Sequence, residues 1–307
     1  MNAARLHDRS AGPALVYEDV PVPDAREGEV LVRVHAAAVT PTELRWSPTS
    51  ITRTGDPRPL PLIMGHEFSG VIGARGPGVF DLAEGDTVFG MNDRFRDGAQ
   101  AEYCVARAAE VARKPVTVDH VQAAVTPISA LTAWQGLIDR AQVAAGQRVL
   151  VHGASGGVGI FAVQLAQQRG AHVIGTCSAA DADFVRQLGA GQVIDYGTQR
   201  FEEVASQMDV VFDTVGGETL DRSWQVLRRP GGRLVTIAAS AEKSPDPRVR
   251  SAFFIVEASR TQLEDIARLI DRGSLRVVVG AVFPLAEAHR AYAHKPERGK
   301  TVLTIAS

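Results

Sequence analysis

The stretch from Val149 to Ala166, VLVHGASGGVGIFAVQLA, decides the fold, because an apolar strand meets a glycine-rich turn and then an amphipathic helix. Its glycines follow the spacing Gly153-x-x-Gly156-x-x-Gly159. Such a turn lets the backbone approach a pyrophosphate, whose charge the amide N–H groups and the helix dipole stabilise. A purely structural turn is the alternative, but the strand before the turn and the helix after it favour a dinucleotide. The predicted phosphate-binding residues are Ser155, Gly156, Gly157 and Val158.

Around this turn, apolar strands alternate with helices. The predicted strands are RVLVHG, HVIGTC, QVIDY, DVVFDTV, GRLVTIA and SAFFIVE. Strands that alternate with helices indicate βαβ units and a parallel sheet covered on both faces, and six strands is the number of a full dinucleotide fold. We therefore predict an α/β protein whose residues 120–258 form a Rossmann domain with a doubly wound, parallel six-stranded sheet.

The chain before this domain has a different texture. From Ala14 to about Ala112, short apolar runs are broken by proline and glycine, which predicts a β-rich region. Ser47–Pro61 is rich in proline, threonine and serine and is predicted to be a surface loop. The short β elements after Glu257 are similar, so residues 1–119 and 259–307 are predicted to form one further domain.

Bulk properties favour a small-molecule partner. The chain has 307 residues and a formal net charge of −2, with lysine and arginine scattered singly. No basic stripe is present that would bind nucleic acid, and no run approaches the ~20 apolar residues that span a bilayer. The N-terminus lacks the apolar region of a signal peptide. With only two cysteines, we expect reduced thiols and a cytoplasmic protein.

The end of the second predicted strand indicates which coenzyme binds. NAD-specific sites place an aspartate or glutamate there, whereas this chain has Ser178, which can donate to a 2′-phosphate. Tyr196 could donate to the same phosphate or cap the core instead. Arg186 is the only lysine or arginine between residues 171 and 199, and Asp181 is placed to swing in toward a hydroxyl. The prediction is NADP(H), with the Asp181 alternative open.

The chain resembles the medium-chain dehydrogenase/reductase superfamily, in its zinc-independent, quinone oxidoreductase-like branch. The resemblance rests on an ordered series of motifs that runs nearly end to end. They are YEDVPVP, GEVLVRVHAAAV, GHEFSGVI, GDTVFG, GAQAEYCV, ALTAWQGL, GASGGVG, LGAGQVIDY, FDTVGG, RRPGGRLVTIA and GKTVLTIA. It implies a GroES-like β-rich catalytic domain beside the Rossmann domain, and a homodimer.

The zinc-dependent members of the superfamily bind the metal through ligands that this sequence largely lacks. His66 of the GHE motif is present, but Thr40 stands near the early ligand position and Ile128 near the third. A catalytic zinc needs about three nitrogen, sulfur or oxygen ligands, and two cysteines cannot build a four-thiolate structural site. We therefore predict that no metal binds and that His66 is hydrogen-bonded in the wall of the site, with Glu67 bracing that wall.

The resemblance also implies the remaining site residues. Thr40 or His66 would donate to a substrate carbonyl, although Thr40 and Thr42 could simply form a turn. Trp46 is a candidate wall of the substrate pocket, because a flat apolar ring suits conjugated ligands, or it anchors a loop. The further positions expected near the coenzyme are Thr42, Thr132, Ile237, Ala238, Phe254 and Lys300.

Together these features predict an NADPH-dependent oxidoreductase. It would transfer a hydride to a quinone or to an activated alkene or carbonyl compound. Two alternatives stay open: a zinc-type alcohol dehydrogenase, and a nucleotide-binding sensor or structural protein with little turnover.

Overall fold

The computed structural model describes residues 1–8, 14–44 and 47–305 and divides into two compact units. The first unit comprises Met1–Ile128 and Ala258–Ser307, and the second comprises Ser129–Glu257. The sequence placed the domain boundaries at 119/120 and 258/259. The difference at the first boundary arises because helix α1 (His120–Ala124) packs against strands of the first unit.

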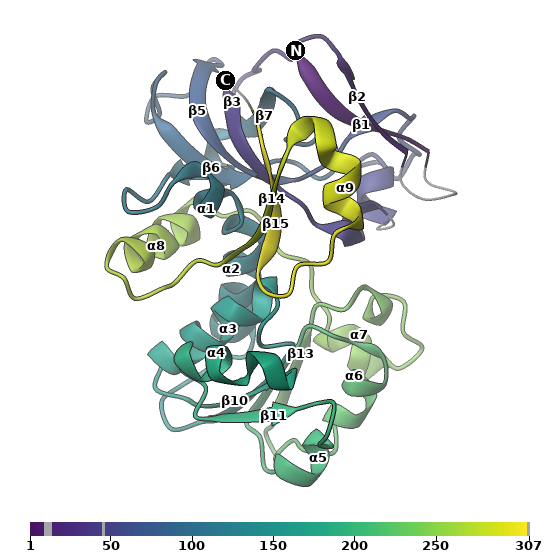
Figure 1. The fold of residues 1–307 in the computed structure, drawn as a ribbon, viewed down its shortest axis with the longest axis vertical. Coiled ribbons are helices and arrows are strands. Elements are labelled where there is room, and N and C mark those ends of the chain that lie inside the picture. Colours follow the sequence, from purple (N-terminus) through teal and green to yellow (C-terminus); the bar gives the residue numbers. More distant parts are fainter. Residues whose placement is uncertain (9–13, 45–46, 306–307) are drawn as a thin grey trace. The chain divides into compact units, whose positions relative to one another are not determined.

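The first unit is built from two sheets that are antiparallel except for β14 and β15, which pair in parallel (Figure 1). A small sheet has the order β2-β1-β4, and a larger one has the order β14-β15-β3-β5-β6-β8, with β7 also paired to β3. The bounds are β1 Asn2–Asp8, β2 Ala14–Asp19, β3 Glu29–Ala38, β4 Leu62–Ile63, β5 Glu67–Arg75, β6 Thr87–Met91, β7 Tyr103–Arg107, β8 Val111–Arg113, β14 Val279–Pro284 and β15 Lys300–Thr304. Because β15 pairs with β3, the C-terminal segment completes the sheet of the N-terminal region.

Few helices occur in the first unit. They are α1, α8 (Arg260–Asp271), α9 (Ala288–Ala293) and the 3-10 turns η1 (Pro41–Leu44), η2 (Ser47–Ser50), η3 (Ala108–Glu110) and η7 (Leu285–Glu287). The predicted surface loop contains η2 and a single β-bridge between Ile51 and Pro57. The core under the sheets is apolar and includes the fully buried Val32, Phe68 and Leu303.

The second unit has a parallel sheet in the order β11-β10-β9-β12-β13. The strands are β9 Arg148–His152, β10 His172–Cys177, β11 Gln192–Asp195, β12 Val210–Asp213 and β13 Arg233–Thr236. The helical elements of this unit are the end of α2 (Pro127–Trp134), η4 (Gln135–Arg140), α3 (Gly157–Gln168), η5 (Ala179–Asp181), α4 (Ala182–Gln187), α5 (Phe201–Val204), α6 (Gly217–Ser223), η6 (Ala239–Ala241) and α7 (Pro247–Ala252). All four residues of β12 are buried, as expected for a strand covered on both faces.

The predicted sixth strand, SAFFIVE, is not a strand. Only one parallel bridge, between Thr236 and Phe253, extends the described sheet beyond β13. The amide of Phe254 donates to the Thr236 carbonyl at 3.3 Å, and no ladder follows. The segment begins inside helix α7, which ends at Ala252, so only a few residues are left to run beside β13. The parallel sheet and the order expected of a dinucleotide fold are confirmed, with five paired strands rather than six.

Candidate functional site

The glycine-rich turn after β9 brings the backbone very close to its neighbours. Gly153 has φ +70°, and a Cβ there would lie 2.5 Å from the hydroxyl oxygen of Thr214. A Cβ on Gly159 would lie 2.0 Å from the carbonyl oxygen of Gly153. Only glycine fits at both positions, so the strand can turn directly into helix α3.

Helix α3 begins with an open N-terminus. Gly156 is its N-cap residue, is exposed, and provides no side chain to cap the first amides. A Cβ on Gly156 would have one neighbour within 4 Å, the Gly153 carbonyl oxygen at 3.3 Å. The N–H groups and dipole of this twelve-residue helix therefore face a space that can accept an anion. This geometry fits a dinucleotide diphosphate at Ser155, Gly156, Gly157 and Val158.

The topology supports that assignment. In the order β11-β10-β9-β12-β13, successive strands are added on one side of β9 up to β11 and on its other side from β12 onward, so the strand order reverses between β9 and β12. Open α/β sheets bind their ligands at such a point, beyond the carboxyl ends of the strands. The loops after the two strands are bonded together, since the Thr214 hydroxyl donates to the His152 carbonyl at 2.7 Å. Buried Asp213 shapes the second loop by accepting from the amides of Val215 and Gly216, each at 3.1 Å.

At the end of β10 the structure corrects the prediction that no carboxylate is present. The Ser178 hydroxyl donates to Asp181 Oδ2 at 3.0 Å, and the Ser155 hydroxyl donates to the same oxygen at 2.9 Å. The 3-10 turn η5 causes this arrangement, because the Asp181 amide bonds the Ser178 carbonyl and the side chains three residues apart come together. Ser155 and Ser178 thus belong to one site, with Asp181 between them.

The neighbouring positions differ in exposure. Tyr196 is 69% exposed beyond β11, so it does not cap the core, and its amide bonds the Cys177 carbonyl at 3.2 Å. Its ring is therefore available to a ligand at the same sheet edge as Ser178. Arg186 lies in α4 and forms an exposed ion pair with Asp183 at 2.7 Å.

The residues expected near the nicotinamide fall into two groups. Ile237 and Ala238 follow β13 at the carboxyl edge of the sheet, where their amides bond the Asp213 carbonyl and the Thr236 hydroxyl. Thr132 and Phe254 are buried, with exposed fractions of 4% each. Phe254 packs under the guanidinium of Arg140, 4.7 Å from the ring centre, so its contacts within this unit are those of a packing residue.

In the first unit the predicted Thr40 and Lys300 form one buried cluster with Glu67. Lys300 Nζ donates to Thr40 Oγ1 at 3.0 Å and to Glu67 Oε1. The Glu67 side chain is fully buried and also accepts from the Ile128 amide at 2.9 Å. Burial raises the pKa of Glu67, and the charge of Lys300 only partly offsets that effect. The pairing exists because β15, which begins at Lys300, lies beside β3.

His66 forms a second buried pair, with Glu43. His66 Nδ1 lies 2.9 Å from Glu43 Oε2, and His66 Nε2 lies 3.3 Å from the Arg96 carbonyl oxygen. Both ring nitrogens therefore face acceptors, which favours the doubly protonated imidazolium. Burial alone would lower the pKa of His66, but the Glu43 carboxylate outweighs it and the pKa lies above its usual value. The expected hydrogen-bonded histidine is present, and Glu43 is its partner.

These contacts do not fit a catalytic zinc ion. The carboxylates near His66 already accept hydrogen bonds from other groups. Glu43 is bonded to His66 and to the Gly65 amide, and Glu67 is bonded to the ammonium group of Lys300. Within residues 1–8, 14–44 and 47–305, no group of three or more histidine, cysteine or carboxylate side chains could hold a metal ion. The ammonium group of Lys300 bonds Thr40 Oγ1, at the residue that stands near the early ligand position, and a cation there disfavours a metal ion.

Two predicted residues are not part of this cluster. Thr42 is exposed on the 3-10 turn η1, which matches its interpretation as a turn residue. Trp46, the candidate substrate residue, lies outside the described residues.

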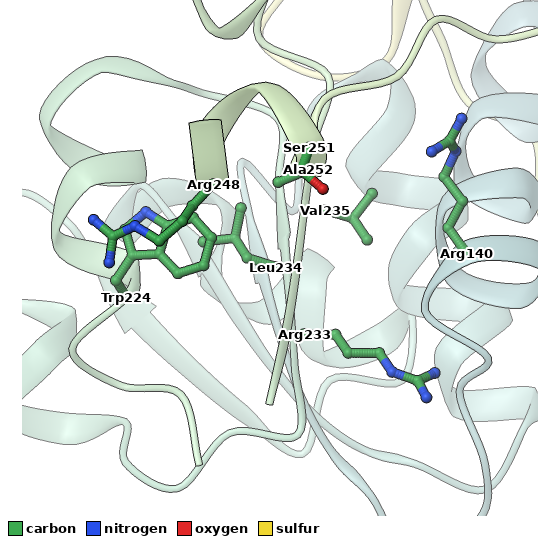
Figure 2. A pocket seen from close by; sticks show the side chains of 8 residues that line it. All are labelled: Arg140, Trp224, Arg233, Leu234, Val235, Arg248, Ser251 and Ala252. Carbon is green, nitrogen blue, oxygen red and sulfur yellow. The ribbon is translucent and has the colours of Figure 1, made fainter. Parts of the chain in front are cut away.

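A separate hollow lies on the second unit, and three arginines are among the residues that line it (Figure 2). Its volume is about 480 Å³, and it borders β13 and α7. The lining residues are Arg140, Trp224, Arg233, Leu234, Val235, Arg248, Ser251 and Ala252. Arg248 lies over Trp224 and pairs with Asp246. None of the predicted coenzyme residues lines this hollow.

Two carboxylates were missed as functional residues. Glu43 lies in a short 3-10 turn, where the sequence shows neither helical nor strand periodicity. Its partner His66 is 23 residues away along the chain. Asp181 was noticed only as an alternative, although the spacing Ser178-x-x-Asp181 was the available signal for a turn.

No described helix is both long enough and apolar enough to cross a membrane.

Comparison with known proteins agrees with the two-unit architecture. Residues 26–116 match the alcohol dehydrogenase GroES-like domain, and residues 188–303 match the zinc-binding dehydrogenase family. The human mitochondrial NAD(P)H oxidoreductase RTN4IP1 is 34% identical, with 90% of this chain and 82% of the relative covered. A chloroplastic NADPH-dependent alkenal/one oxidoreductase of Arabidopsis thaliana is 31% identical, covering 90% and 71%. The quinone oxidoreductase structure from Coxiella burnetii has a TM-score of 0.89 at 29% identity, covering 99% of both chains.

The fold, the dinucleotide turn and these matches define a two-domain oxidoreductase with a GroES-like and a nucleotide-binding domain. The chain belongs to the medium-chain dehydrogenase/reductase superfamily. The resemblance to this superfamily seen in the sequence is therefore confirmed, as is the oxidoreductase class. The names of the relatives also support the predicted NADP(H) cofactor.

Proposed function

We propose that this chain transfers a hydride from NADPH to a quinone or to an activated alkene or carbonyl compound, without a catalytic zinc ion. The observation that carries the proposal is the uncapped N-terminus of α3 at the point where the winding of the parallel sheet reverses. The names of the relatives support the acceptor class, because quinone and alkenal/one oxidoreductases are both among them.

The second unit supplies the coenzyme site. The amides of Gly157 and Val158 at the start of α3 would hold the diphosphate, and the Ser155 hydroxyl lies beside them. The exposed ring of Tyr196 would contact the adenosine half at the adjoining strand ends. The bound coenzyme supplies the hydride, so the protein has to bind it, orient it and stabilise the charge that forms on the acceptor.

The first unit supplies a hydrogen-bond donor for the acceptor oxygen. Thr40 Oγ1 accepts from Lys300 Nζ, which leaves the threonine hydroxyl proton for another acceptor, and no such acceptor is found among the described residues. Thr40 is half-buried, whereas His66 is 3% exposed and bonded on both sides. We therefore assign Thr40 as the donor to the substrate carbonyl, polarised by Lys300. The Glu43–His66 pair shapes the wall beside it.

A panel of acceptors tests this function. Oxidation of NADPH and NADH is followed with quinones, enones, enals and aldehydes, while coenzyme binding is measured in parallel by fluorescence titration. We expect turnover with quinones or enones, and a loss of kcat of about 100-fold in Thr40→Val, the size of a lost charge-stabilising donor. Binding of NADPH without oxidation by any acceptor would indicate a sensor instead.

Metal analysis separates the proposed reaction from that of a zinc-type alcohol dehydrogenase. The protein purified without chelator is expected to contain much less than one zinc per chain and to keep its activity in a chelating buffer. Stoichiometric zinc together with alcohol oxidation would contradict the proposal.

The homodimer and the cytoplasmic location stay predictions, for which light scattering and cell fractionation are the measurements.

A further inference from the structure

We propose that Asp181 weakens the binding of a 2′-phosphate and so sets the balance between NADPH and NADH in this chain. The inference rests on the proposed function, because it concerns the adenosine end of the same coenzyme site. It assigns a role in specificity to a residue that lies outside the turn motif and three positions beyond Ser178.

The first step is geometric. Asp181 is 8% exposed, and its Oδ2 accepts from the hydroxyls of Ser155 and Ser178. Ser155 belongs to the phosphate-binding turn and Ser178 follows β10, so one carboxylate joins the two segments that flank the adenosine ribose in this fold. A donor already committed to a carboxylate is not free to donate to a phosphate.

The second step is electrostatic. A carboxylate accepts a hydrogen bond from a ribose 2′-hydroxyl but repels a 2′-phosphate, which carries a charge between about −1.5 and −2 at neutral pH. The segment offers little positive charge in return. Arg186 is the only lysine or arginine between residues 171 and 199, and its guanidinium pairs with Asp183. Binding of NADPH therefore requires Ser178 to leave Asp181, or the 2′-phosphate to approach a buried negative charge.

The third step is the local backbone, which holds the carboxylate in place. The Asp181 amide bonds the Ser178 carbonyl at 3.0 Å within η5, and α4 follows immediately. The side chain is thus held by two hydrogen bonds from two segments and the backbone by a third, so the carboxylate does not swing freely as that of a surface aspartate would. Its effect on the ligand is accordingly a fixed property of the site.

Substitution of Asp181 tests the inference. Asp181→Asn removes the charge and keeps an oxygen that can accept from both serines, so the turn is preserved. Calorimetry is used with two probes that lack nicotinamide, adenosine 2′,5′-bisphosphate and AMP. We expect the variant to bind the bisphosphate at least about tenfold more tightly, while the affinity for AMP changes less than about threefold.

Asp183→Asn is the matched control. It removes the same charge two residues away, from a side chain that is 90% exposed and paired with Arg186. Because exposed charges are screened, we expect less than about a threefold change with either probe. Asp181→Ala serves as the second test variant, and thermal melting shows whether each variant is folded.

The outcomes distinguish the inference from the function on which it rests. An unchanged or weaker affinity of both folded Asp181 variants for the bisphosphate overturns the inference, and NADPH oxidation by the wild-type protein would still support the function. An equal gain in Asp183→Asn also overturns it, because the effect would then be one of net charge. If wild type and variants bind neither probe nor NADPH, the coenzyme site itself is wrong and the inference falls with it.

Discussion

At the scale of single residues, the first unit depends on a buried charge that has one cationic partner. Glu67 is fully buried, and Lys300, 12% exposed, is bonded to it and to Thr40. Removal of one partner of a buried pair leaves the other charge unsolvated, which costs far more than the intact pair contributes. Lys300 therefore both positions Thr40 and stabilises the fold at neutral pH.

Lys300→Met is expected to lower the free energy of unfolding by about 3 kcal/mol at pH 8. The pKa of Glu67 is already raised by burial and rises further without Lys300, so protonation relieves the buried charge as the pH falls. The loss should be clearly smaller at pH 5. Urea denaturation at both pH values measures it, and Glu67→Gln/Lys300→Met is the control that restores most of the stability. An equal loss at both pH values would contradict this account.

A second residue, His120, makes the stability of the fold depend on pH. His120 stacks on His35 with ring centres 4.4 Å apart, and its Nδ1 lies 2.8 Å from Ser69 Oγ. Burial, aided by the charge of His35, lowers the pKa of His120 to about 4. A histidine with a lowered folded-state pKa binds fewer protons when folded than when unfolded. Stability is therefore lost as the pH falls from about 6.5 toward 4.

We expect His120→Gln to reduce this acid loss by about 1 to 2 kcal/mol, a range that allows for partial solvent exposure. Chemical denaturation from pH 7.5 to pH 4.5 gives the slope for both proteins. His172, exposed at the start of β10, provides the control substitution and should leave the slope unchanged. If His120→Gln had the wild-type slope, the stacked pair would not be the acid-sensitive group.

At the scale of elements, the proposed function requires that the N-terminus of α3 binds the diphosphate of the coenzyme. Gly156→Asp places a carboxylate at the N-cap, where it can accept from the helix amides, and its Cβ requires the Gly153 carbonyl oxygen, at 3.3 Å, to shift by a few tenths of an ångström. We expect the helix to keep or gain up to about 1 kcal/mol of stability, while NADPH affinity falls at least about 100-fold. Fluorescence titration and thermal melting measure the two effects.

Gly156→Ala is the control for that substitution, because it adds the same Cβ without the charge and should retain most of the affinity. Normal NADPH binding in Gly156→Asp would show that the diphosphate lies elsewhere.

The segment SAFFIVE shows, also at the scale of elements, that hydrophobic periodicity does not always identify a strand. The apolar run SAFFIVE has the composition of a buried strand, but a single bridge to Thr236 is all that pairs it with the described sheet.

At the scale of the whole molecule, coenzyme binding should raise the stability of the unit that holds it. With free NADPH at 100 times its Kd, a ligand that binds only the folded state adds about 2.7 kcal/mol. We expect a concentration-dependent rise in Tm that is absent from Gly156→Asp. Calorimetric scans with and without NADPH measure the rise, and an equal shift in the variant would indicate binding at another place.

The architecture was predictable from the sequence because it depends on short-range patterns. The Gly153-x-x-Gly156-x-x-Gly159 turn, the alternation of strands and helices, and the broken β runs are all local, and hydrophobic periodicity responds to burial directly. The candidate phosphate-binding residues were predicted for the same reason, because they lie within that turn. The conformation of a turn follows from the residues within it.

The partners inside the site were decided only by tertiary structure. Lys300 meets Glu67 across 233 residues and His66 meets Glu43 across 23, because β15 lies beside β3 and the turn η1 folds over the start of β5. Hydrogen bonds and buried charges act over a few ångströms in space, irrespective of separation along the chain. The sequence alone therefore predicted the superfamily and a glycine-rich turn suited to a coenzyme, and the folded chain determined which carboxylate each cation and each serine contacts.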